Sequence, residues 1–223
     1  MIYYFIMTVP GTCPRIKAVT LSCIVWTLIL STSSAQAPSR AVFSVNAARS
    51  RIELTVFRAG LLKMIGHDHA ILARSFSGEV RFNPANVEDS SVQLIIESGS
   101  LIVLDAHGVS ENHRKEIQAN MEGVQVLNIQ EFPQIMFRST EVRRAATCGG
   151  DLTLRGELRL HGVQKEIVFP VQVMQEKNLL RVTGRAEINQ TDFGIKPIKA
   201  AAGGLRVKDR MDVKFEILAE RAN

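Results

Sequence analysis

Most of the chain after Ser39 alternates hydrophobic and polar residues with a period of two. Ile52, Leu54 and Val56, for example, are separated by charged or hydroxyl-bearing residues. Successive side chains of a strand point to opposite faces, so this period predicts strands with one buried and one solvated face. About eight or nine strands are expected, and the clearest cover residues 51–56, 79–82, 92–97, 135–137, 152–160, 167–173, 180–188 and 213–217.

Short turn signals separate these segments. Clusters of glycine, proline, asparagine and aspartate occur at residues 83–86, 149–151 and 203–204, and a glycine at residue 162 opens a further turn. Such short links join antiparallel neighbours and leave no room for the crossovers of a parallel sheet. Antiparallel strands of this kind close into a barrel or stack as a sandwich, and the alternation alone does not separate the two.

One segment breaks the pattern. Residues 110–121 are mostly polar, contain few β-branched residues, and begin with Ser110, a residue type that caps helix N-termini. The sequence therefore predicts a single short helix within a long connection. No repeat, charge block or proline-rich linker indicates a second domain.

The first 35 residues have the layout of a secretory signal peptide. Arg15 and Lys17 are their only charges, and an apolar run at residues 18–30 follows directly. This run is shorter than the roughly 20 residues that a membrane-spanning helix needs, although an uncleaved signal anchor is the alternative. Ala35 ends a small-residue stretch that suits cleavage, so a leader at 1–35 and an exported domain at 36–223 are expected. In a Gram-negative bacterium that location would be the periplasm.

Removal of the leader changes the composition. The remaining chain carries 25 basic and 22 acidic residues, a surplus of only +3, which is not typical of nucleic-acid binding. It contains no tryptophan or tyrosine, so base-stacking and sugar-binding platforms are less expected. Cys148 is its one cysteine, which leaves no partner for an internal disulfide despite the oxidising compartment.

The residues offer one candidate for metal chemistry. On a strand, His67 and His69 would project from the same face about 7 Å apart, and His107 or His113 from the long connection would supply a third ligand. The alternative is a structural role, in which Asp68 accepts a hydrogen bond from one histidine and fixes a loop. Nucleophilic catalysis has no support, because the chain lacks a G-x-S-x-G elbow and a phosphate-binding glycine loop.

An ordered set of short motifs resembles the YceI-like family of secreted lipid-binding proteins. The resemblance runs from about Ala41 to Glu220, and each motif alone is weak. In order along the chain, the motifs are Ser50-Arg51-Ile52-Glu53-Leu54, the stretch Phe76-Ser77-Gly78-Glu79-Val80-Arg81-Phe82-Asn83-Pro84, Val126-Leu127-Asn128 with Phe132-Pro133-Gln134-Ile135-Met136-Phe137-Arg138-Ser139-Thr140, Gly150-Asp151-Leu152-Thr153-Leu154, and Ile188-Asn189-Gln190-Thr191-Asp192-Phe193-Gly194-Ile195. The histidine-aspartate-histidine cluster at 67–69 departs from the commoner family pattern, which has one isolated histidine.

The resemblance implies an antiparallel, lipocalin-like β-barrel of about eight strands, often dimeric. It also implies a long apolar cavity that takes a polyisoprenoid or fatty-acyl chain, without cofactor or catalysis. Among the predicted inward-facing residues, the favoured cavity candidates are Leu54, Val56, Phe82, Leu94, Phe137 and Phe169.

Three functions follow as expectations. The first is non-catalytic binding or transport of an amphiphilic lipid in the barrel. The second is a metal-binding protein or metal-dependent enzyme using His67 and His69, and the third is a structural or interaction module with a fully packed barrel. A group of basic residues near the turn at 203–204 would either meet an anionic head group or keep a sheet edge soluble: Lys196, Lys199, Arg206, Lys208 and Arg210.

Overall fold

The computed structural model describes residues 40–59, 68–104, 110–145, 151–200 and 205–222. The predicted leader at 1–35, His67, His107, Cys148 and the turn at 203–204 lie outside the described residues. The strands are β1 (Ala41–Val45), β2 (Arg51–Ala59), β3 (His69–Ala73), β4 (Phe76–Phe82), β5 (Ser91–Glu97), β6 (Leu101–Val103), β7 (Gln134–Arg144), β8 (Leu152–Leu160), β9 (Val163–Glu176), β10 (Leu179–Asn189), β11 (Lys199–Ala200) and β12 (Leu205–Arg221). The helix α1 spans Glu111–Glu122, and four 3₁₀ turns are η1 (Ala47–Arg49), η2 (Val87–Asp89), η3 (Ser98–Ser100) and η4 (Gln190–Phe193).

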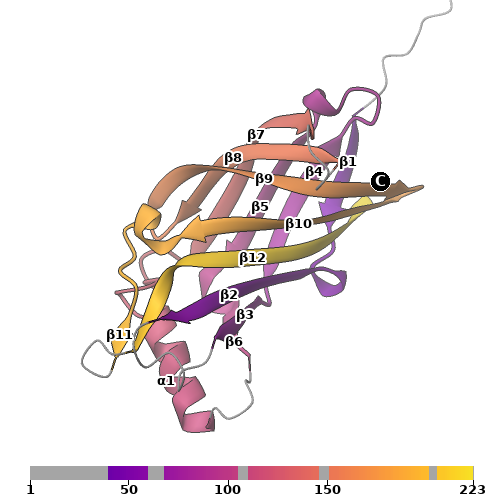
Figure 1. Ribbon diagram of the computed structural model, residues 1–223. Coiled ribbons are helices and arrows are strands. Elements are labelled where there is room, and N and C mark those ends of the chain that lie inside the picture. Colours follow the sequence, from indigo (N-terminus) through magenta and orange to yellow (C-terminus); the bar gives the residue numbers. More distant parts are fainter. Residues whose placement is uncertain (1–39, 60–67, 105–109, 146–150, 201–204, 223) are drawn as a thin grey trace, which may run out of the picture. The chain divides into compact units, whose positions relative to one another are not determined.

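The strands form a closed antiparallel barrel (Figure 1). Both β1 and β2 pair with β12 on one side. On its other side β1 pairs with β4, which pairs with β5, while β2 pairs with β3, which pairs with β6. Three couples of strands that follow one another along the chain, β1 with β2, β3 with β4 and β5 with β6, therefore each occupy one position in the ring as a long, interrupted strand. Together with β7, β8, β9, β10 and β12 they make eight positions around the ring. The prediction of an eight-stranded lipocalin-like barrel is confirmed, and the sandwich alternative is excluded.

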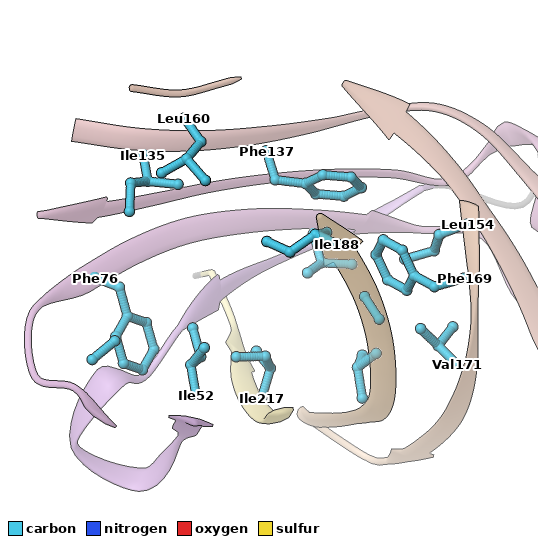
Figure 2. Close-up of a cluster of buried hydrophobic side chains, with 14 of the residues drawn as sticks. Ile52, Phe76, Ile135, Phe137, Leu154, Leu160, Phe169, Val171, Ile188 and Ile217 are labelled. Atoms are coloured by element: carbon cyan, nitrogen blue, oxygen red, sulfur yellow. The ribbon is translucent and has the colours of Figure 1, made fainter. Parts of the chain in front are cut away.

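The interior is formed by the apolar stripe of each strand, as the period of two predicts. On β8 the inward residues are Leu152, Leu154, Leu158 and Leu160, while charged residues between them face solvent. Side chains from strands on different sides of the ring point toward one another across the interior, among them Ile52, Phe137 and Ile188 (Figure 2). In the described part of the chain no helix is long and apolar enough to cross a membrane.

The predicted helix is confirmed with Ser110 as its cap, and it ends at Glu122, one residue beyond the predicted end at Met121. The Ser110 hydroxyl accepts a hydrogen bond from the His113 backbone N–H, so Ser110 is the N-cap. Figure 1 shows α1 at the end of the barrel where β6 and β11 lie. The side chain of Gln118 pairs with β6: its Oε1 accepts from the Val103 N–H and its Nε2 donates to the Leu101 carbonyl, both at 2.8 Å. The Gln118 amide thus makes hydrogen bonds to β6 of the kind that a neighbouring strand would make.

Candidate functional site

The barrel encloses a cavity of about 410 Å³. Its wall is made of aliphatic and phenylalanine side chains from every long strand of the ring, together with Ile117 and Met121 of α1. Polar lining residues are Arg58, His69, His113, Glu116, Asn120, Gln190 and Arg206. Volumes of 300–1,000 Å³ with mostly apolar walls are typical of small-molecule sites. The barrel is therefore not packed through its whole length.

One end of the interior is filled by side chains. On β1, Val45 lines the cavity, but Phe43, the next inward residue, does not and is fully buried. On four other strands, too, the inward residue two positions beyond the last lining residue is buried and does not line the cavity. We call these five residues the floor: Phe43, Phe82, Leu152, Leu180 and Ala219. Leu180 and Ala219 are paired in register and both have 0% exposure, so the interior is tightly packed there.

Three phenylalanine rings contact one another in a row along the cavity wall. The ring centroids of Phe137 and Phe169 are 5.4 Å apart, and those of Phe169 and Phe215 are 5.8 Å apart. Two glycines make room for these rings: a Cβ on Gly156 would lie 2.6 Å from the Phe137 ring, and a Cβ on Gly184 would lie 2.6 Å from the Phe215 ring. The rings thus lie against the wall where the wall has no side chain, which keeps the centre open.

The opposite end is the mouth, which we define by Arg58, His69, Arg206 and the α1 residues His113, Glu116 and Asn120. On β2 the inward stripe runs Ile52, Leu54, Val56 and then Arg58, and on β3 Ile71 is followed by His69. The inward face of both strands thus changes from apolar to polar near this end, with His69 paired beside Val56 and Arg58 two residues further along β2. The Asp68 carboxylate accepts a 2.9 Å hydrogen bond from the Arg58 backbone N–H, and the Arg58 Nε lies 3.8 Å from it. On α1, His113 Nδ1 lies 3.4 Å from Glu116 Oε2.

Polar groups inside the cavity are few and satisfied. Gln190 is 5% exposed, and its Nε2 donates to the Lys208 carbonyl at 2.7 Å. Within the described ranges, no buried side-chain nitrogen or oxygen lacks a hydrogen-bond partner. A ligand in the deep part of the cavity would therefore meet a wall that attracts it through apolar contact, which is non-directional.

Groups with a perturbed pKa lie away from the cavity. The hydrogen bond from Arg114 lowers the pKa of Glu111, and the hydrogen bond from Arg210 lowers the pKa of Asp212 and raises the pKa of Arg210. None of these three lines the cavity. In the described ranges, no group of three or more histidine, cysteine, aspartate or glutamate side chains is placed to hold a metal ion. Because His67 and His107 lie outside those ranges, metal binding at His67 and His69 stays a prediction.

The structure brings most of the predicted cavity residues together. Leu54, Val56, Leu94, Phe137 and Phe169 all line the cavity. Phe82 is buried on the same inward stripe as Val80 but belongs to the floor, because alternation identifies a face and not a height along the barrel. Whether these residues contact a ligand stays a prediction.

Several lining residues were missed by the sequence analysis. Ile117 and Met121 are four residues apart on α1, a spacing that places them on one helix face, and this signal was available. Arg58 continues the alternation of β2 but is charged, so the pattern gave no reason to place it inside. Phe215 is identified only by the register that sets it opposite Gly184.

Comparisons with known proteins agree on the family. The model of the YceI-like domain matches residues 43–219. A UPF0312 protein of Shewanella denitrificans is 28% identical over 161 residues, which cover 70% of this chain and 76% of that protein. Protein YceI of Salmonella arizonae is 29% identical over 101 residues, or 45% of this chain and 47% of that protein.

Solved structures show the same fold. BcnA of Burkholderia cenocepacia has a TM-score of 0.60 at 20% identity, covering 78% of this chain and 98% of that chain. The YCEI protein of Campylobacter jejuni has a TM-score of 0.51 at 15% identity, covering 69% and 85%. With the family model matching most of the chain and the barrel enclosing an apolar cavity, this protein belongs to the YceI-like domain family.

Proposed function

We propose that the protein binds or carries one amphiphilic lipid, of polyisoprenoid or fatty-acyl type, without transforming it chemically. The observation that carries the proposal is the distribution of polarity: an apolar cavity with a packed floor at one end and polar residues gathered at the mouth. An amphiphile fits this arrangement with its chain inside and its head at the mouth. Each buried methylene contributes roughly 0.8 kcal/mol, so a chain binds firmly without directional contacts.

The setting of this activity is part of the proposal. We infer that the chain acts after export, in the periplasm if its source is a Gram-negative bacterium. The charged start and the apolar run at residues 18–30 support this location. A homodimer is expected from the family resemblance. The small formal charge surplus gives no support for nucleic-acid binding.

The test is native mass spectrometry of the protein purified from its own export compartment, with organic extraction and metal analysis of the same sample. A hydrophobic adduct of isoprenoid or acyl composition is expected. A sample with no adduct and about one metal ion per chain would instead support the metal-binding alternative.

A tryptophan placed in the cavity gives an independent test. Trp26 is the only tryptophan of the sequence, so a Leu94→Trp variant of residues 36–223 carries a single indole facing the cavity. Val168→Trp is the matched control, because Val168 lies on the outer face of β9 and is 51% exposed. A fatty acid with a brominated chain is expected to quench the indole emission of the Leu94→Trp variant and to leave the emission of the control variant unchanged. Equal quenching of both variants would contradict binding inside the barrel.

A further inference from the structure

We propose that a group of cations on the outer surface beside the mouth docks the barrel on an anionic lipid bilayer. This inference rests on the proposed function, because a bilayer is where an amphiphilic lipid would be taken up or released. The sequence between Asp192 and Asp209 contains no acidic residue. It carries four basic residues, which we call the docking cations: Lys196, Lys199, Arg206 and Lys208.

The positive charge of the chain is concentrated in these residues. Residues 36–223 carry 25 basic and 22 acidic residues, so the four docking cations exceed the whole surplus of +3. The rest of that range has one more acidic than basic residue. A nearly neutral chain thus has one strongly positive stretch, and a local field of this kind attracts anionic surfaces.

The docking cations lie at the opening of the cavity. Their apolar neighbours along the chain, Ile195, Ile198 and Val207, all line the cavity. Figure 1 shows β11, which carries Lys199, at the same end of the barrel as α1. The same part of the chain therefore contributes apolar side chains to the cavity wall and cations to the surface around the opening.

The strand register places three of these cations on one outer face. Lys199 of β11 is directly opposite Arg206 of β12. Arg206 in turn pairs with β2 on the face of Phe57, and the Lys208 Nζ lies 5.5 Å from the centroid of the Phe57 ring. Like charges directly opposite each other are destabilising, so the Lys199–Arg206 pair costs stability that an anionic surface would restore.

Elsewhere on the outer wall, cations are neutralised across strands. Arg181 of β10, for example, forms an ion pair with Glu216 of β12. Within the described ranges, the docking lysines Lys196, Lys199 and Lys208 are exposed and form no ion pair. Their charge is therefore not balanced by a direct acidic neighbour.

Nearby acidic residues are engaged with other partners. Asp209 follows Lys208, but its carboxylate accepts hydrogen bonds from the Thr191 N–H at 2.8 Å and from the Thr191 hydroxyl at 2.6 Å. On α1, Glu111 pairs with Arg114. The docking lysines are therefore open to anionic groups from outside the protein.

A bilayer surface matches this charge. Three of the four docking cations are lysines, which act as point charges on flexible stems and do not impose the fixed geometry of an arginine fork. Phospholipid head groups present mobile anionic groups over a broad surface, so a fixed geometry is not required. Each Lys or Arg near an anionic membrane surface raises binding about fivefold. Contact through these cations would bring the opening of the cavity next to the lipid.

The first test is cosedimentation of the protein, purified from its export compartment, with two kinds of vesicle. One kind is phosphatidylcholine alone, and the other contains about one third phosphatidylglycerol. The protein is expected to bind the anionic vesicles at least tenfold more tightly and to leave them at about 1 M salt, where the Debye length is about 3 Å. Equal binding to both vesicles, or binding that resists the salt, would overturn the proposal.

Two triple variants of equal net charge locate the docking surface. The docking variant combines Lys196→Gln, Lys199→Gln and Lys208→Gln and should bind the anionic vesicles about a hundredfold more weakly. The control variant removes three exposed cations from the outer faces of β4, β10 and β12 and should stay within about twofold of the parent protein: Arg81→Gln, Arg181→Gln and Lys214→Gln. Equal losses in the two variants would contradict a local surface. Unchanged binding of the docking variant would leave its lysines the role of keeping a sheet edge soluble.

A DNA duplex at the same phosphate concentration tests another class of anionic surface. It is expected to bind at least tenfold more weakly than the anionic vesicles. Equally tight binding of the duplex, lost in the docking variant, would assign these cations to polyanions in general and overturn the commitment to a bilayer.

Quenching by the brominated fatty acid separates this proposal from the proposed function. In the Leu94→Trp background, the docking variant should keep its quenching in solution and lose only its vesicle binding. Loss of both would trace the effect to the barrel itself and overturn the assignment to its surface. If the indole is quenched but the parent protein does not bind anionic vesicles, docking fails and lipid binding stands. If vesicles bind but no quenching occurs, the proposed function fails and docking stands.

Discussion

Two glycines and two phenylalanines set the width of the cavity at the level of single residues. A Cβ on Gly156 would lie 2.5 Å from the Arg138 carbonyl and 2.6 Å from the Phe137 ring. The absence of a side chain at this position is therefore what lets the ring lie against the wall. Because Phe169 of β9 contacts both Phe137 and Phe215, the three rings and the two glycines beneath them form one packing unit across β7, β8, β9, β10 and β12.

Gly156→Ala should both destabilise the protein and narrow the cavity. The new methyl group forces the ring of Phe137 inward and strains the backbone at Arg138, and overpacking of this kind costs about 1–3 kcal/mol of unfolding free energy. Urea denaturation would measure the loss of stability, and displacement of a fluorescent fatty-acid probe by unlabelled fatty acids would measure the narrowing of the cavity. Gly99→Ala is the control, because the nearest atom, Ile129 Cδ1, is 3.8 Å away. Equal behaviour of the two variants would contradict the packing of Phe137 on Gly156.

Asp212 gives a pH-dependent contribution to stability. Its carboxylate accepts hydrogen bonds of 2.8 and 3.2 Å from Arg210, and these lower its pKa below the ordinary 3.8. Because the folded state then binds a proton less readily than the unfolded state, the contribution is complete above the ordinary pKa and is lost as the pH falls through the lowered value. The effect is small, since both side chains are exposed.

A double-mutant cycle of Asp212→Asn and Arg210→Gln measures this coupling. The coupling free energy is expected to be favourable at pH 7, to fall as the pH drops below the ordinary pKa of the carboxyl, and to disappear below its lowered pKa in the folded protein. A coupling that grows as the pH falls would contradict the sign. Urea denaturation at a series of pH values is the measurement.

At the scale of elements, α1 completes the wall at β6. Gln118 satisfies the Val103 N–H and the Leu101 carbonyl, so Gln118→Leu would leave both backbone groups without their partner. An unsatisfied buried group costs about 1–3 kcal/mol, and the helix should separate from β6 more readily. Hydrogen exchange at Val103 should accelerate and the urea midpoint should fall. Gln125→Leu, at an exposed position after the helix, is the matched control; an equal loss in both would contradict this role.

Elements differ in how well the sequence predicts them. Residues 152–160 alternate without interruption and form β8 with the predicted bounds. Strands β1, β3 and β6 were missed because they are segments of three to five residues. They are too short for a period to be recognised, and they become strands through pairing with neighbours distant in sequence.

The position of the cavity along the barrel was also not predictable. Alternation assigned Phe82 to the interior correctly. The boundary between floor and cavity, however, depends on how tightly Phe43, Leu180 and Ala219 are packed at that end of the barrel. That packing follows from the strand register, which includes an irregularity between Val207 and Met211. A one-residue change in register reverses the face of every later side chain, and no local sequence signal fixes it.

For the whole molecule, ligand binding and folding should be coupled. The cavity exists only in the closed barrel, so a chain that occupies it stabilises the folded state by mass action. Tetradecanoate at a hundred times its Kd should add about 2.7 kcal/mol, which raises the Tm by about 5–10 °C for a domain of this size. Differential scanning calorimetry is the measurement. A Tm that stays constant while binding saturates would contradict occupation of the folded interior.

The packed floor also has a consequence for the direction of traffic. Because the floor is packed, the proposed lipid would enter and leave the cavity by the mouth alone, so its chain would enter first and its head group would leave first. Donor and acceptor must then visit the same face of the barrel, near α1, and cannot occupy it together. Transfer of the proposed lipid would then be sequential: the donor dissociates before the acceptor binds, and the lipid stays enclosed in the barrel between the two steps.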